Sequence, residues 1–196
     1  MSSLLDKLGV WNLILDHLEE LPLDTLTENT PYRRWLDRNF DHLRDTLTQM
    51  AVFNFTIQYT TITADSTSPA FRWSYRYRTP GDCLHYLPPT RGGYHGGTPI
   101  DNEQVGLWIY TDYAGPLDLE WIARTEAMEE WSPLAVAALS YYVAFRMANR
   151  FTAKANLRDR IGAAFSQAWR QALTVDARQG TPRPVDQEDI LLARQN

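Results

Sequence analysis

The stretch from Ser132 to Arg178 constrains the fold most, because its apolar residues recur at helical spacing through two consecutive segments. Ser132 followed by Pro133 is an N-cap with proline at the first helical position, where the missing N–H does no harm. The predicted helix, residues 133–151, is apolar nearly all round, and such a helix is buried on more than one side. We expect one stripe to pack inside the chain and a second to face a neighbouring subunit. The second stripe consists of Val136, Leu139, Val143 and Met147.

Three further helices are predicted from the same four- and three-residue spacing. The last spans 157–178, after a cap at Asn156 and before Gly180, and the first two span about 3–20 and 30–51. Their expected boundaries are a cap at Ser3, an end at Pro22 and a second cap-plus-proline start at Thr30–Pro31. Four helices of one pattern predict a helical bundle.

Between the second and third helices, residues 53–124, the spacing changes from helical to alternating. Aromatic residues, with Ile57, alternate with polar residues over 53–60, and aromatic residues alternate with polar ones again over 71–78, on the other side of a polar loop. This predicts an antiparallel pair with its rings inward and Arg72, Arg76 and Arg78 outward. Further extended segments are expected at 82–87, 105–111 and 117–124, with a glycine-rich loop at 88–99.

The predicted fold class is therefore α+β, mainly α: a bundle of about four helices carrying a small, mostly antiparallel sheet. Residues 1–178 form the domain. Residues 179–196 are expected to be an extended C-terminal arm, since two prolines precede a short amphipathic segment. The arm's candidate binding residues are Arg183, Ile190, Leu191 and Leu192.

Charge and cysteine usage narrow the classes of function. A net charge of −5 argues against a general nucleic-acid binder. A single cysteine, Cys83, excludes an internal disulfide framework and fits a reducing compartment. With no secretory leader and no apolar run of membrane length, we expect a soluble protein, without membrane partners, made in a host cytoplasm.

The sequence shows no constellation typical of an enzyme. The glycine-rich loop at 91–97 lacks the lysine and the following helix of a phosphate-binding loop. The four histidines lack metal-ligand spacing, and Cys83 near His85 is better explained as a small apolar residue than as a nucleophile. We therefore expect no catalytic residue, no metal and no cofactor. Contacts of Arg72, Arg76 and Arg78 with DNA or an acidic partner stay open.

The order of these elements resembles the tail tubular protein A family, the head-to-tail adaptors (connectors) of short-tailed phages. The matching residues are Trp11-Asn12, Leu21–Leu26, Phe53-Asn54-Phe55, Trp73–Tyr77, Pro80, Asp82-Cys83-Leu84, Leu107–Asp112, Leu134–Arg150, Ala168, Ala172 and Asp176-Ala177. They cover most of residues 8–178 as a pattern of spacings, and the tail after Gly180 has no clear counterpart.

The resemblance implies a virion protein that forms a ring, usually of twelve copies, in the neck of the particle. The ring would sit between the portal protein and a downstream tail or nozzle protein, with double-stranded DNA passing through its lumen. Two alternatives stay open: a head-completion or stopper protein of the same neck and, from another class, a small nucleic-acid-processing enzyme.

Overall fold

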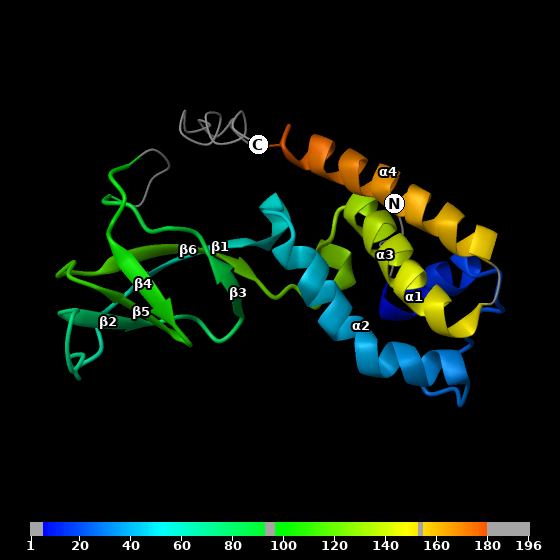
Figure 1. The fold of residues 1–196 in the computed structure, drawn as a ribbon, viewed down its shortest axis with the longest axis horizontal. Helices are drawn as coiled ribbons and strands as arrows, with labels where there is room; N and C mark the ends of the chain where they lie inside the picture. Colours follow the sequence, from blue (N-terminus) through cyan, green and yellow to red (C-terminus); the bar gives the residue numbers. More distant parts are fainter. Residues whose placement is uncertain (1–5, 93–96, 153–154, 180–196) are drawn as a thin grey trace. The chain divides into compact units, whose positions relative to one another are not determined.

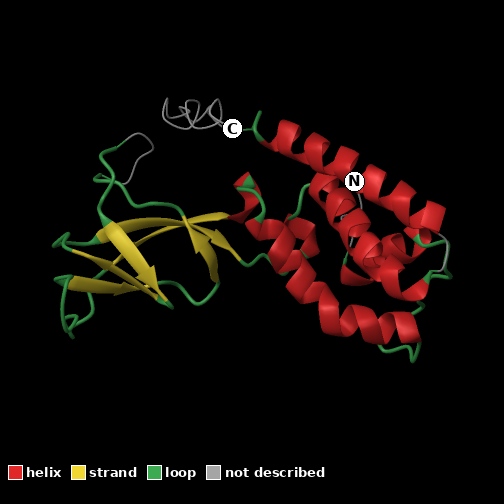
Figure 2. Cartoon of the chain, viewed as in Figure 1, coloured by secondary structure: helices red, strands yellow, loops and turns green. Residues whose placement is uncertain are grey.

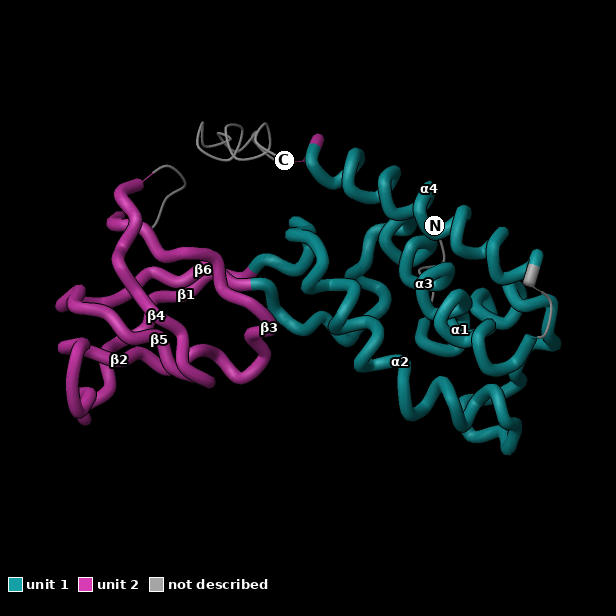
Figure 3. Tube along the Cα trace, viewed as in Figure 1, with its two compact units in different colours: residues 1–57, 122–177 teal, residues 58–121, 178–196 magenta. Residues whose placement is uncertain are grey.

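A computed structural model describes residues 6–92, 97–152 and 155–179. The chain divides into two compact units (Figure 3). Of the described residues, those up to 57 and those from 122 to 177 form the helical unit, and those from 58 to 121, with 178 and 179, belong to the sheet unit. Within the described residues there are four α-helices and two small antiparallel sheets, which confirms the α+β class (Figures 1 and 2). None of these helices has the length and hydropathy that a membrane span requires.

Helix α1, Lys7–His17, begins and ends differently from the prediction. Its N-cap is Asp6, whose carboxylate accepts the Gly9 N–H at 2.8 Å, whereas Ser3 lies outside the described residues. It ends before Pro22 in a Schellman motif, in which Glu19 has φ 61° and the Glu20 N–H donates to the Leu15 carbonyl. The sequence did not predict this helix end, because the left-handed position is occupied by Glu19 and not by the glycine that is typical there.

Helices α2, Pro31–Gln49, and α3, Pro133–Phe151, begin as predicted. Thr30 accepts the Arg33 N–H at 3.1 Å, and Ser132 accepts the Ala135 N–H at 3.3 Å. Helix α4, Ala155–Asp176, starts before the expected cap at Asn156, and Gly180 lies outside the described residues.

Helix α3 lies at the centre of the helical unit and contacts α1, α2 and α4 (Figure 1). The stripe expected to face another subunit is in fact the core: Val136, Leu139, Val143 and Met147 are at most 5% exposed. The interface prediction for these four residues is therefore wrong, because the chain's own helices cover them. The other stripe, including Leu134, Tyr141 and Phe145, is only half-buried.

The strands form two sheets, not one. The first has the order β1-β6-β3, from Ile57–Ile62, Leu117–Ala123 and Cys83–Tyr86. The second has the order β2-β5-β4, from Tyr75–Arg78, Trp108–Thr111 and Asn102–Val105. The predicted pairing of residues 53–60 with 71–78 is wrong, since β1 and β2 belong to different sheets, and residues 54–56 form a 3-10 turn.

Two asparagines hold distant parts of the helical unit together. The Asn12 side chain both accepts the Leu23 N–H, at 2.7 Å, and donates to the Leu23 carbonyl, at 3.0 Å. The Asn54 N–H donates to the carboxylate of Asp176, at 3.0 Å, and the Asn54 amide donates to the Asp176 carbonyl, at 2.7 Å. Asn12 thus fastens the segment after α1 to that helix, and Asn54 fastens the end of α4 to the segment after α2.

The Asn54–Asp176 pair has an electrostatic cost that the hydrogen bonds offset. An acidic residue at a helix C-terminus faces the negative end of the helix dipole. Asp176 nevertheless closes α4 and is only 6% exposed. Phe53, next to Asn54 in the sequence, stacks on Phe55 and makes a T-shaped contact with Trp169 of α4. These ring contacts and the Asn54–Asp176 hydrogen bonds, which we call the clamp, together fix the end of α4.

We predict that Asp176→Ala lowers the free energy of unfolding by about 1.5–3 kcal/mol, because it leaves a part-buried N–H without its charged acceptor. Asn54→Ala should cost about 0.5–1.5 kcal/mol, and the double variant less than the sum of both. Urea denaturation measures these values. Asp159→Ala, at an exposed position of α4, is the control and should stay within about 0.5 kcal/mol of the parent. A loss at Asp176 as small as that of the control would contradict the clamp.

Candidate binding groove on the outer face of a small sheet

The register of the sheet β2-β5-β4 assigns its residues to two faces. Residues directly opposite each other on neighbouring strands share a face. Tyr77 lies opposite Ile109, and both are fully buried on the inner face. One position along, Arg76 lies opposite Tyr110, which lies opposite Glu103 on its other side. This second row must point to the outer face, because successive side chains of a strand alternate.

The outer face carries a groove of about 540 Å³. Residues 68–73 form part of its wall, and Arg76, Tyr110, Glu103 and Val105 contribute from the three strands. Two of its apolar residues are unusually exposed, Phe71 at 83% and Val105 at 55%. The groove therefore combines open apolar surface with charged groups.

Glu103 connects the wall of the groove to the sheet. Its Oε2 atom accepts the indole N–H of Trp73 at 3.0 Å and lies 3.0 Å from a guanidinium nitrogen of Arg72. One carboxylate on β4 thus fixes both an aromatic ring and a cation of the segment that precedes β2.

Arg76 occupies the middle of the outer face. It forms an ion pair with Asp65 at 2.8 Å, and its guanidinium lies 4.4 Å from the ring centroid of Trp108. The hydrogen bond from Arg76 holds the pKa of Asp65 below its ordinary value. Arg76 is consequently held in place and already partnered within the sheet unit.

Arg72 has a strained backbone. Its φ is 70°, and the Trp73 N–H donates to the Phe71 carbonyl at 2.9 Å, which closes a three-residue γ-turn. A non-glycine residue in such a conformation costs about 1–3 kcal/mol, and strain of this kind concentrates at functional sites. The turn projects Phe71 outward, next to the groove.

The sequence prediction for the arginine run was right at some positions and wrong at others. Tyr77 points inward, and Arg78 is exposed as expected. Phe71 is exposed instead of buried, since β2 begins only at Tyr75 and the alternation does not extend upstream of it. Arg72 and Arg76 lie at the groove, but each is paired with an acidic residue, Glu103 and Asp65.

Sequence reasoning missed the partners that complete the groove, namely Asp65, Glu103, Val105 and Tyr110. Strand β4 was hidden because the expected strand at 105–111 is broken by Gly106, whose φ of 61° turns the chain between β4 and β5. The Val-Gly-Leu sequence at 105–107 was the signal that marks a hairpin turn at this point.

Cys83 does not have the environment of a nucleophile. It lies half-buried on β3, and burial, with a contribution from Asp82, raises the pKa of its thiol to about 11. At neutral pH the group is a protonated thiol, in keeping with the apolar interpretation of the sequence. Among the described residues, no group of three or more His, Cys, Asp or Glu side chains could hold a metal ion.

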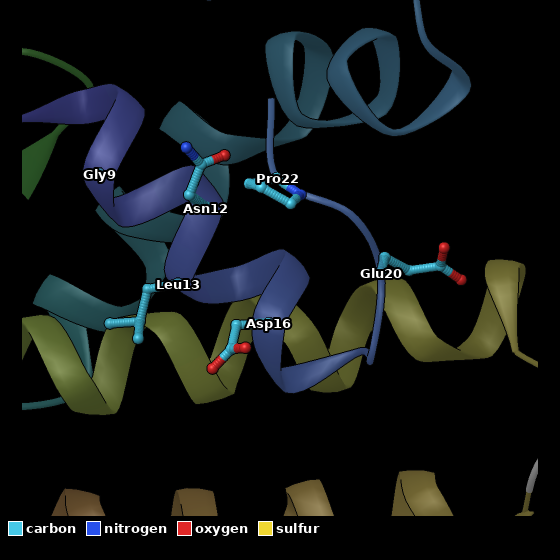
Figure 4. Close-up of a pocket in the computed structure, with 6 residues that line it drawn as sticks. All are labelled: Gly9, Asn12, Leu13, Asp16, Glu20 and Pro22. Atoms are coloured by element: carbon cyan, nitrogen blue, oxygen red, sulfur yellow. The ribbon is translucent and has the colours of Figure 1, made fainter. Parts of the chain in front are cut away.

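The helical unit has a pocket of its own, of about 330 Å³ (Figure 4). Gly9, Asn12, Leu13 and Asp16 line it from α1, and Glu20 and Pro22 line it from the segment that follows. Because Asn12 is engaged with Leu23, the pocket marks where that segment is fastened to the helix.

His17 joins α1 to α3, a role that its sequence position did not predict. Its ring stacks on Tyr141 at 3.9 Å, and its Nε2 lies 3.0 Å from the Ser140 hydroxyl. Since that hydroxyl donates to the Ala137 carbonyl, Nε2 must carry the proton and donate to Ser140. Burial lowers the pKa of His17, with Asp16 partly opposing the shift.

Comparisons with known proteins do not identify the chain: no protein-family model and no curated protein matches it.

We predict that Arg72→Gly leaves the free energy of unfolding within about 0.5 kcal/mol of the parent, although it removes an ion pair. Relief of the strained φ is worth about 1–2 kcal/mol and offsets the exposed pair, at most about 1 kcal/mol, and the added backbone entropy. Arg78→Gly, in an ordinary strand conformation, should instead cost about 1 kcal/mol. Equal losses in urea denaturation would show that Arg72 is not strained.

We also predict that His17 makes stability fall as the solution is acidified. Because the folded-state pKa is lowered, the unfolded chain binds the proton more readily. The free energy of unfolding should therefore drop as pH falls through the unfolded pKa of about 6.5, and level off below the folded pKa. His17→Gln should flatten this part of the profile, whereas His42→Gln, at an exposed site on α2, should leave it unchanged. Identical profiles for both variants would refute the assignment.

Proposed function

We propose that this chain is a structural adaptor of a virion neck, forming a ring between the portal protein and the tail of a short-tailed phage, through which double-stranded DNA passes. One observation carries the proposal. Several residues behind the family resemblance are those whose side chains hold the helical unit together: Asn12 with Leu23, and Asn54 with Asp176. A spacing pattern maintained by structural contacts is the kind that a structural family would share.

The proposal includes the finer architecture. The four helices act as one bundle around α3, and the sheet unit is an insertion between α2 and α3. Residues 179–196, of which 180–196 lie outside the described structure, serve as an arm that binds the portal through Arg183, Ile190, Leu191 and Leu192. The partners are further copies of the chain, a twelve-membered ring in all, the portal, the downstream tail or nozzle protein and DNA.

Ring closure requires two different adhesive surfaces on each subunit. The buried stripe of α3 cannot supply one, so the surface must come from exposed apolar residues. Leu21 is the best candidate in the helical unit, since it is 85% exposed on a segment whose backbone is fixed at Leu23 by Asn12. A rigid exposed leucine loses little entropy when it is buried by a neighbour.

The location follows from the same proposal: assembly in the host cytoplasm and residence in the virion neck, without catalysis or a cofactor. A head-completion or stopper protein of that neck would share these features and would differ in whether DNA is blocked or passed.

We predict that Leu21→Asp prevents ring formation and leaves folding intact, because the side chain is exposed in the single chain. Sedimentation velocity and electron microscopy, alone and with portal protein, should show discrete rings for the parent and smaller species for the variant. Gln171→Asp, at an exposed polar site on α4, is the matched control and should still form rings. Val143→Asp, in contrast, should unfold the chain. A parent chain that stays monomeric with portal protein present would overturn the adaptor proposal.

A further inference from the structure

The groove on the sheet unit offers apolar surface that the described chain leaves open. Its apolar and aromatic lining consists of Phe71, Trp73, Val105 and Tyr110. Phe71 and Val105 are mostly exposed. Its charged lining residues are Arg72, Arg76 and Glu103, a net charge of +1. Arg78 adds a further positive charge to the same face, opposite Trp108. The groove thus favours an occupant with aliphatic side chains and an acidic flank.

We propose that this groove binds residues 185–192 of the same chain, Val-Asp-Gln-Glu-Asp-Ile-Leu-Leu. The segment carries three acidic residues and no basic one, directly followed by Ile190, Leu191 and Leu192. The aliphatic side chains fill the space beside Phe71 and Val105, and the acidic residues lie toward the arginines. Both features that the groove requires therefore occur together in the part of the chain that the structure does not describe.

The length of the chain beyond the described structure sets how far the segment can reach. Ile190 is eleven steps along the chain from Gln179, and a fully extended chain reaches up to about 36–40 Å over that number of steps. This exceeds the diameter of a small domain, about 30 Å. A short flexible connection gives an effective concentration in the millimolar range, so that even a weak contact within one chain is populated.

The same reasoning disfavours other occupants. A nucleic acid backbone would leave the exposed apolar side chains of Phe71 and Val105 without a partner, and it would approach a chain of net charge −5. The segment of a second copy lacks the advantage of the covalent connection until copies are brought together. Binding within the chain is also reversible, and a stronger partner for the segment can displace it.

This inference concerns the free chain and does not rest on the adaptor proposal. If both hold, the groove keeps the arm from its portal partner until the portal competes for it.

The test places a nitroxide label on Gln195→Cys in the full chain and observes the indole N–H signals of the tryptophans by NMR. Labelling at pH 7 spares Cys83, because its pKa of about 11 keeps the thiol protonated. The signals of Trp73 and Trp108, on the sheet unit's outer face, should lose most of their intensity. Trp11, in the core of the helical unit, should keep its signal.

Three variants of the labelled chain show whether the groove causes the effect. Phe71→Ser with Val105→Ser should restore the two signals, as should serine at positions 190, 191 and 192 together. Tyr59→Ser removes an aromatic side chain that is 68% exposed on β1, and is the matched control that should change nothing. No loss of signal in the parent, or a loss that persists in both the groove variant and the segment variant, overturns the proposal.

A mixing experiment separates binding within one chain from binding between copies. Isotope-labelled chain without nitroxide is mixed with nitroxide-bearing chain without isotope, so that only contacts between copies broaden the signals. Unbroadened signals support binding within the chain. Broadening as strong as in the singly labelled sample would assign the segment to a neighbouring copy and overturn the proposal as stated.

Discussion

The burial of α3 is the constraint on which the helical unit depends. Small residues along this helix, among them Ala135, Ala138, Ala144 and Ala148, are fully buried and let the neighbouring helices approach closely. The approach of α4 is close enough that a Cβ at Gly162 would lie 3.2 Å from the Phe145 ring. The stripe of Val136, Leu139, Val143 and Met147 is therefore not available to another subunit, whereas the stripe with Leu134, Tyr141 and Phe145 is only half-buried. Any assembly of the chain must therefore use residues that the helical unit leaves exposed, and this reverses the role that the apolar pattern of α3 first suggests.

Polar contacts between distant residues supply what helix packing cannot. Apolar burial is non-directional, so it does not by itself fix where α4 ends or how the segment after α1 leaves the helix. The hydrogen bonds of Asn54 with Asp176, and of Asn12 with Leu23, are directional and specify both points. Three residues of the family resemblance, Asn12, Asn54 and Asp176, can therefore be explained by the geometry of the fold. These contacts support the structural role proposed above, since the side chains of Asn12 and Asn54 are engaged in holding the helical unit together.

The sequence predicted what is local and missed what depends on contacts between distant residues. The caps at Thr30 and Ser132 and the strand at 117–123 follow from neighbouring residues, and each occurs close to where it was expected. The partner of β2 does not follow from its own alternation, because β5 satisfies that alternation as well as β1 would. The groove was out of reach for the same reason: Asp65 and Glu103 become its residues only when the sheet brings them to Arg76 and Arg72. Nor does spacing alone say which side of α3 is covered, since that depends on the three helices packed around it.

The groove differs from the rest of the molecule because strain, exposed rings and paired charges coincide there. Stability does not require either feature, since the backbone of Arg72 is strained and a phenylalanine that is 83% exposed lowers solubility. Their joint presence beside Glu103, which pairs with Arg72, supports the proposal that this surface binds a segment of the chain. The arginines are already neutralised by Asp65 and Glu103, so the contact is specified mainly by apolar shape, and charge sets the orientation of what binds. An aliphatic segment with an acidic flank meets both conditions, and this chain carries one.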